Sequence, residues 1–253
     1  MGKGKRLKQQ RLARVPQPGC LSPGELATDE QELLELLQRM PANHLPYLGL
    51  AAVYLASSPV RNANQCLMAS TLLMLAMRNF GITADLVALE VEAPDGSVRY
   101  GTETPRFEGD TLKGHVGLIA DSTFIDATAS QFREIRATNG VRPISGPLGE
   151  HASQIRTEGG RVGIQLAEGK VVTYNIHRIG SADGVGAKFM RMQPDGALAH
   201  AVQNLITTFI AMVANVRPND PTGFPSLDQL IRNAQGMDTR NDHGVLRLVP
   251  RRA

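Results

Sequence analysis

The chain has 253 residues, of which 42% are hydrophobic and 20% charged, so it contains enough apolar material for a folded core. Two cysteines are too few for a disulfide scaffold or a Cys-rich zinc module. The apolar runs 45–56 and 205–216 are shorter than the roughly 18 residues of a membrane span, and no apolar segment follows the basic N-terminus as in a secretory signal. We therefore expect a cytoplasmic protein without a membrane segment; a secreted effector stays open as an alternative.

Basic residues are concentrated at the N-terminus. The net charge is +3, but the first fourteen residues carry six cations and no acid, which leaves −3 for the rest of the chain. Because residues 1–27 are also rich in Pro and Gly, we expect a flexible tail that could contact nucleic acid or an acidic partner, or simply aid solubility. Its cations are Lys3, Lys5, Arg6, Lys8, Arg11 and Arg14.

Helical patterns occupy the first third of the chain. A helix is expected to begin at Thr28, in a capping-box pattern, and to end before Pro41. A second, short helix should begin at Pro46. The third, over 65–80, is apolar nearly all round, which predicts a position in the middle of the fold, with Asn64 as its N-cap.

Strand-like alternation follows the apolar helix. It predicts three hairpins, 84–93 with 97–101, 115–120 with 123–126, and 162–167 with 171–176. Beyond them we expect loops near 136–160 and over 180–186, a helix over 196–216 and a short helix from Ser226. The pattern favours an α+β protein with a central domain over 28–180 and a C-terminal loop and helices over 181–253 packed on it.

Three residues form a candidate reactive set: Cys66, His115 and Asp126. The first turn of a helix favours a thiolate at Cys66, because its unpaired N–H groups and its dipole stabilise negative charge. A His on an adjacent strand can accept the thiol proton and return it to a leaving group. A carboxylate on the next strand can fix the imidazole tautomer, and the tight turn of the predicted hairpin brings His115 and Asp126 together.

Each of the three residues also has a structural interpretation. A free Cys is among the most buried residue types, so Cys66 could be a packing residue of an apolar helix. His115 could be a hydrogen-bonded strand residue, and Asp126 could simply end a strand. Cys20 lies in a Pro/Gly segment and is either an accidental thiol or a partner for Cys66 under oxidation.

The order of these residues carries a resemblance. Gln65-Cys66 at the head of a buried helix, Gly114-His115-Val116 on a strand and the segment 124–128 after it resemble the transglutaminase-like group of the papain-like cysteine protease superfamily. The likeness spans roughly residues 60–135. It implies a papain-like core, a buried Cys helix packed on an antiparallel sheet, with extra helices at both ends.

The resemblance also implies a function. Cys66 would be the nucleophile, His115 the general base and acid, and Asp126 the orienting carboxylate, acting on protein or peptide amides through an acyl-enzyme. The chain has no Trp for an oxyanion donor, so the candidates are the Cys66 backbone N–H and the side chains of Gln65 and Asn64. We expect no cofactor and no metal. The alternatives are an inactive papain-like binding module with a basic tail, and an effector that modifies a foreign protein.

Deleting residues 1–14 should test the tail. Six cations without an acid bind polyanions mainly by releasing counterions, so binding should be salt-dependent and independent of sequence. We expect the deletion to abolish polyanion retention in a binding assay at low salt while the reactivity of Cys66 stays the same. Unchanged retention after the deletion would assign the tail to solubility alone.

Overall fold

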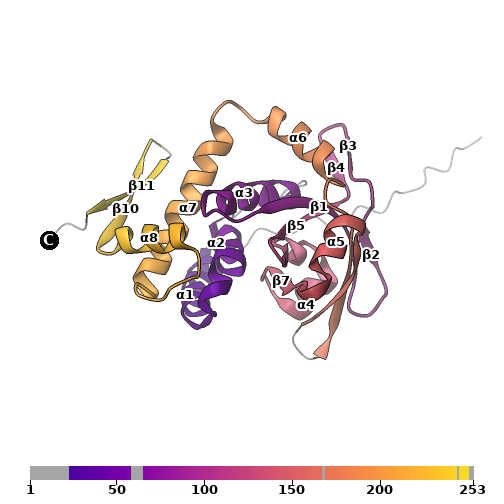
Figure 1. Ribbon diagram of the computed structural model, residues 1–253, viewed down its shortest axis with the longest axis horizontal. Coiled ribbons are helices and arrows are strands. Elements are labelled where there is room, and N and C mark those ends of the chain that lie inside the picture. Colours follow the sequence, from indigo (N-terminus) through magenta and orange to yellow (C-terminus); the bar gives the residue numbers. More distant parts are fainter. Residues whose placement is uncertain (1–22, 58–64, 167–168, 244, 251–253) are drawn as a thin grey trace, which may run out of the picture.

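The computed structural model describes residues 23–57, 65–166, 169–243 and 245–250. It is a mixed α+β structure in which helices α1, α2, α7 and α8 gather at one end and the sheet, with α4 and α5, lies at the other (Figure 1). Helix α3 lies between these two parts and packs on the sheet. The described residues do not include the basic cluster of the predicted tail, nor Cys20 or Asn64.

The N-terminal helices agree with the sequence patterns except at their starts. Helix α1 (Pro23–Arg39) begins before the expected Thr28, because a proline suits a first helical turn, where its missing N–H leaves no bond unmade. A 3₁₀ turn (Ala42–His44) and a π-helical turn (Leu45–Gly49) lead into α2 (Leu50–Ser57). Helix α3 (Gln65–Asn79) confirms the central apolar helix, with ten of its fifteen residues buried.

A seven-stranded antiparallel sheet forms the second layer. Its order is β7-β6-β5-β1-β9-β8, with β2 added beside β1. The strands are β1 (Ala84–Glu92), β2 (Arg99–Gly101), β5 (His115–Ala120), β6 (Thr123–Asp126), β7 (Ile144–Pro147), β8 (Gly160–Gln165) and β9 (Val171–Ile176). The three predicted hairpins are therefore present. The sheet curls until its outer strands meet, since a Cβ on Gly146 of β7 would lie 3.4 Å from the Ile164 side chain of β8.

Several short elements were missed in the sequence. Helices α4 (Arg133–Asn139) and α5 (Ala152–Glu158) and strand β7 replace the loops expected near 136–160; each of these helices buries one residue, which leaves no apolar period to detect. Helix α6 (Asp183–Met192) begins inside the expected loop 180–186. Two further hairpins, β3 (Arg106–Glu108) with β4 (Thr111–Lys113) and β10 (Met237–Asp242) with β11 (Val245–Pro250), were also missed, because β3 and β4 are only three residues long and β10 is mostly exposed.

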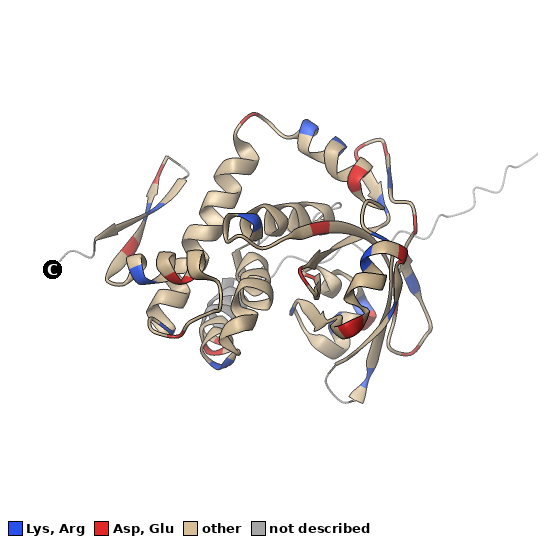
Figure 2. Ribbon diagram, viewed as in Figure 1, with Lys and Arg blue, Asp and Glu red and all other residues tan. Residues whose placement is uncertain are grey.

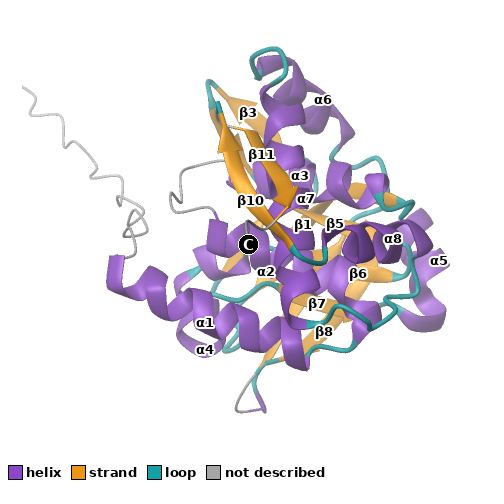
Figure 3. Ribbon diagram, turned by 90° about the vertical axis from the view of Figure 1, so that its left-hand side faces the viewer, coloured by secondary structure: helices purple, strands orange, loops and turns teal. Residues whose placement is uncertain are grey.

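The C-terminal helices complete the helical end. Helix α7 (Ala197–Val216) packs on α1, α2, α3 and α8 (Pro225–Ala234), and the β10–β11 hairpin lies beside it, away from the main sheet (Figures 1 and 3). Figure 2 shows α7 without a charged residue. Among the described helices it is the one whose length and composition would suit a membrane span, but Phe209 and Val213 on one of its faces are fully buried in the protein. In all, 39% of its most apolar stretch is buried, so one face of α7 packs on the protein.

The interior divides into two apolar clusters on the two faces of the sheet. The first joins α1, α2, α3, α7 and α8 to the face of β5 that carries Val116 and Leu118. The second fills the concave side of the curled sheet and includes Leu89, Phe124 and Tyr174. Strands β1 and β5 contribute side chains to both clusters, so the sheet holds the two halves of the molecule in a fixed relation.

Replacing Gly117 by Ala should disturb the packing of the sheet. A Cβ at that position would lie 2.9 Å from the Ile125 carbonyl oxygen of β6 and 2.6 Å from the Leu89 side chain, closer than real Cβ atoms approach. We expect Gly117→Ala to lower the free energy of unfolding by about 1–3 kcal/mol in chemical denaturation. The control is Gly184→Ala in α6, where the added Cβ meets no atom within 4 Å. Equal stability of the two variants would contradict the packing described here.

Candidate functional site

Helix α3 holds Cys66 in its first turn. Cys66 follows Gln65, the first residue of the helix, and is 4% exposed. One turn later on the same side, the Ser70 hydroxyl donates a 3.1 Å hydrogen bond to the carbonyl oxygen of Val116 in β5. Because Val116 directly follows His115, this bond fixes the start of α3 against the start of β5. The positive end of the helix dipole lies at this first turn, near the thiol.

The β5–β6 hairpin places His115 and Asp126 on the same face of the sheet. Its register pairs Leu118 with Ile125, and the next pair in that register is Gly117 with Asp126, so His115 lies diagonally across from Asp126. The His115 Nε2 atom is 2.7 Å from Asp126 Oδ2. The imidazole is 1% exposed and the carboxylate is fully buried, so solvent does not weaken this contact.

Further donors surround the buried carboxylate of Asp126. Its Oδ1 accepts the backbone N–H of Thr128 at 3.0 Å and lies 3.4 Å from the Thr128 hydroxyl. Its Oδ2 accepts the Tyr174 hydroxyl of β9 at 3.2 Å, in addition to His115. A buried carboxylate is tolerated when its lone pairs are hydrogen-bonded in this way.

These contacts change the proton affinity of His115. Burial alone would lower the pKa of the imidazole, but the charge and hydrogen bond of Asp126 raise it, and a hydrogen bond and charge from Cys66 add to the rise. The net direction of the His115 pKa is upward. Burial, followed by the charge and hydrogen bond of Asp126, also raises the pKa of Tyr174, so its hydroxyl remains a proton donor.

An aromatic wall covers the other side of the imidazole. The Phe132 ring meets His115 edge-on with centroids 4.9 Å apart, and Tyr100 of β2 stacks on Phe132 at 4.1 Å. The Tyr100 hydroxyl donates to the carboxylate of Glu134 in α4. These ring contacts limit the orientations open to the His115 ring.

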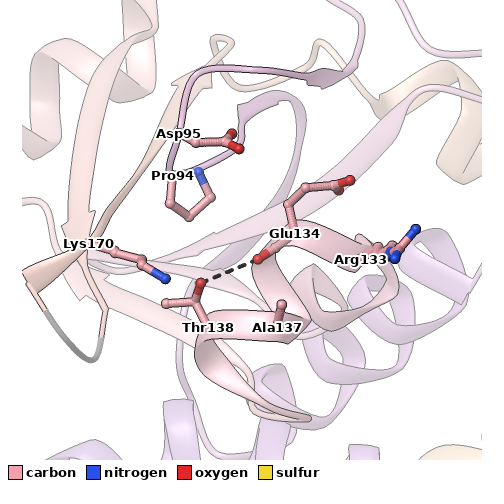
Figure 4. Close-up of a pocket in the computed structure, with 7 residues that line it drawn as sticks. All are labelled: Pro94, Asp95, Arg133, Glu134, Ala137, Thr138 and Lys170. Carbon is pink, nitrogen blue, oxygen red and sulfur yellow. Dashed lines mark hydrogen bonds between the residues drawn. The ribbon is translucent and has the colours of Figure 1, made fainter.

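A surface pocket of about 360 Å³ lies beside Glu134, the residue that accepts the Tyr100 hydroxyl (Figure 4). It is lined by Pro94, Asp95, Arg133, Glu134, Ala137, Thr138 and Lys170, so its wall carries both charge signs. None of the three reactive residues lines it. Cys66, His115 and Asp126 are instead almost completely enclosed.

The structure brings together the three residues singled out in the sequence. Cys66, His115 and Asp126 come from α3, β5 and β6 and lie in contact in that order. Gln65 is partly exposed beside Cys66 at the head of α3, where its side chain is one candidate oxyanion donor. Asn64, the other side-chain candidate, lies outside the described residues.

Four residues around the site were not identified in the sequence: Thr128, Gln131, Phe132 and Tyr174. Gln131 Nε2 is 3.1 Å from His115 Nδ1, and the other three contact His115 or Asp126 as described above. Thr128 has a local signal, because an Asp followed two residues later by Thr commonly forms a side-chain-to-backbone turn. Tyr174 has none, since its position depends on the pairing of β9 with β1 across the sheet.

Comparison with known proteins gives no family assignment. No family model matches the chain, no curated protein is similar to it at a significant level, and no solved structure matches its fold. Within the residues that the structure describes, no three His, Cys, Asp or Glu side chains form a group able to hold a metal ion. The chemistry of the site is therefore argued from its own geometry.

The alkylation rate of Cys66 should depend unusually weakly on pH. An isolated thiol, with a pKa near 8.5, loses reactivity by more than about a hundredfold between pH 9 and pH 6. With Cys20 replaced by Ser, we expect the iodoacetamide rate at Cys66 to fall by less than about thirtyfold, because the imidazolium stabilises the thiolate. Each rate is divided by the rate of the same protein at pH 9. This removes the effect of burial on the access of iodoacetamide to the thiol.

His115→Ala should restore the steep dependence of an isolated thiol. The matched control is His151→Ala, which removes an exposed imidazole 69% accessible to solvent and should leave the profile unchanged. Labelling of Cys66 only after denaturation would show that the thiol is a packing residue.

Proposed function

We propose that the chain is a thiol-dependent amide hydrolase or acyltransferase with a papain-like, transglutaminase-like core. Cys66 is the nucleophile, His115 the general base and acid, and Asp126 the carboxylate that orients the imidazole. The observation that carries the proposal is the buried 2.7 Å contact of His115 Nε2 with Asp126, combined with the thiol that approaches the imidazole from the first turn of α3. The order Cys, His, Asp along the chain agrees with the family that the sequence resembles.

The position of each proton follows from the hydrogen bonds. Because Nε2 faces Asp126, Nδ1 is the ring nitrogen available to the Cys66 thiol. Proton transfer from Sγ to Nδ1 produces a thiolate and an imidazolium, whose charge Asp126 stabilises without taking the proton. The thiolate attacks the carbonyl carbon of an amide and forms an oxyanion. The Cys66 N–H in the first turn of α3, with Gln65 beside it, is the donor set nearest to that oxygen.

Collapse of this intermediate breaks the C–N bond. His115 gives its Nδ1 proton to the departing amine, and the acyl group remains on Cys66 as a thioester. Water or a second amine then attacks the thioester, His115 accepts its proton, and the thiol is restored as the acid or the new amide leaves. Hydrolysis is the favoured outcome, because water is the default acceptor and no described group specifies an amine site.

A binding module is the rival proposal. The three side chains are buried, which would suit a site whose network stabilises the fold and does no chemistry. The orientation of the His–Asp pair toward a thiol favours the enzyme, since a purely structural His needs no nucleophile at its second nitrogen. Covalent capture distinguishes these two proposals.

The experiment is mass spectrometry of native protein after incubation with acyl probes and with peptide amides in H₂¹⁸O. We expect one adduct, on Cys66, and release of ¹⁸O-labelled acid, or of a new amide when a primary amine is added. Both should disappear in Cys66→Ala and His115→Ala. A folded wild-type protein that forms no adduct with any probe would support the binding module.

Asp126→Asn tests whether the carboxylate orients His115. Asn retains the size of Asp but loses the charge and can hold the wrong imidazole tautomer. We expect acylation of Cys66 to slow by about ten- to a thousandfold, with a much smaller change in the thermal midpoint, because thiol enzymes can work with a neutral partner.

Asp228→Asn is the matched control. Asp228 accepts the backbone N–H and the hydroxyl of Thr222, both at 2.7 Å, so it has a Thr contact like that of Asp126 but no His. We expect this variant to lower the thermal midpoint and to spare acylation. The reverse pattern, a destabilised Asp126→Asn protein with wild-type acylation, would remove Asp126 from the mechanism.

A further inference from the structure

The ring nitrogen that must accept the Cys66 proton already has another hydrogen-bond partner. Gln131, the last residue of a 3₁₀ turn (Ala129–Gln131) after β6, places its Nε2 atom 3.1 Å from His115 Nδ1. The same nitrogen is 3.3 Å from the Thr128 hydroxyl. The amide therefore joins both ends of the His–Asp pair, touching His115 directly and Asp126 through Thr128.

The direction of these hydrogen bonds can be traced from Asp126. An ionised carboxylate only accepts, so the single hydroxyl proton of Thr128 points to Asp126 Oδ1, 3.4 Å away. The Thr128 oxygen then has lone pairs for Gln131, which must present an N–H to it. The second N–H of the same amide points to His115 Nδ1, which therefore accepts. The orientation of the amide follows from the charge of Asp126.

An acceptor at Nδ1 means a neutral imidazole with its proton on Nε2, facing Asp126. The Cys66 proton needs the same lone pair that Gln131 occupies. We infer that Gln131 is a positioning residue that caps His115 Nδ1 in the free protein and must withdraw before Cys66 can transfer its proton. This inference rests on the proposed function, and it adds a restraint on the nucleophile that the substrate has to relieve.

The surroundings of His115 fit such a restraint. The titratable groups around the ring are Cys66 of α3, Asp126 of β6 and, through Asp126, Tyr174 of β9, while the Phe132 ring closes one side. Asp126 and Cys66 favour the charged ring, and the Gln131 N–H opposes them, because a hydrogen bond to the neutral form disfavours ionisation. Gln131 is only half-buried, whereas the three reactive residues are enclosed, so it is the member of the network that a substrate meets first.

The test is whether the alkylation rate of Cys66 rises or falls when Gln131 no longer caps His115 Nδ1. In the Cys20→Ser background, we expect Gln131→Leu to raise the iodoacetamide rate at Cys66 by about three- to tenfold at pH 6, the effect of a shift of half to one pH unit, with little change at pH 9. Thr128→Val removes the anchor that fixes the amide and should change the rate in the same direction. The matched control, Gln154→Leu, removes an exposed amide that donates to Glu158 and should have no effect.

A second measurement does not depend on reactivity. In a Cys66→Ala background, ¹⁵N NMR of His115 should show Nδ1 becoming protonated at a higher pH in Gln131→Leu than with Gln131 present. A lower or unchanged alkylation rate in both variants, or an unchanged His115 titration, would overturn the inference. Failure of the proposed function looks different: wild-type protein would form no acyl adduct although the His115 titration still moved.

Discussion

The hydrogen bond between His115 and Asp126 is the constraint on which the surrounding structure depends. A carboxylate with no solvent contact has to find donors within the protein, and here strand, turn and neighbouring strand supply His115, Thr128 and Tyr174. His115 and Thr128 come from the β5–β6 hairpin and the turn after it, whereas the Tyr174 donor requires β9 on the far side of β1. The site is therefore a product of the tertiary fold and of no single segment.

The thiol reaches this pair because of how α3 is attached. An apolar helix could slide along the sheet without large loss of burial, but the Ser70 hydroxyl bonded to the Val116 carbonyl gives it one register. A second polar contact lies at the other end of the helix, where the Arg78 guanidinium donates to the Ala84 carbonyl of β1. The two contacts together set which residue of the helix lies beside His115. The first helical turn then places the positive end of the helix dipole beside the thiol.

The parts of the fold that could be predicted are those with a strong local pattern. The apolar helix 65–79, the hairpins around His115 and Asp126, and the helix 197–216 have long periods or clear turn residues. Helices α4 and α5 bury one residue each, and the strands of the β10–β11 hairpin are mostly exposed, so hydrophobicity carries no signal for them. Tyr174 and Gln131 could not be found because their roles depend on strand pairing and on the direction of hydrogen bonds, which a sequence pattern does not contain.

The curl of the main sheet has a consequence for the behaviour of the protein in a crowded solution. An open sheet of this size would present two outer strands whose free backbone groups can pair with another chain. Here the outer strands β7 and β8 lie against each other through Gly146 and Ile164, and the small glycine permits the approach. Side chains therefore cover part of the two outer strands of the main sheet, and this limits the backbone that another chain could pair with there.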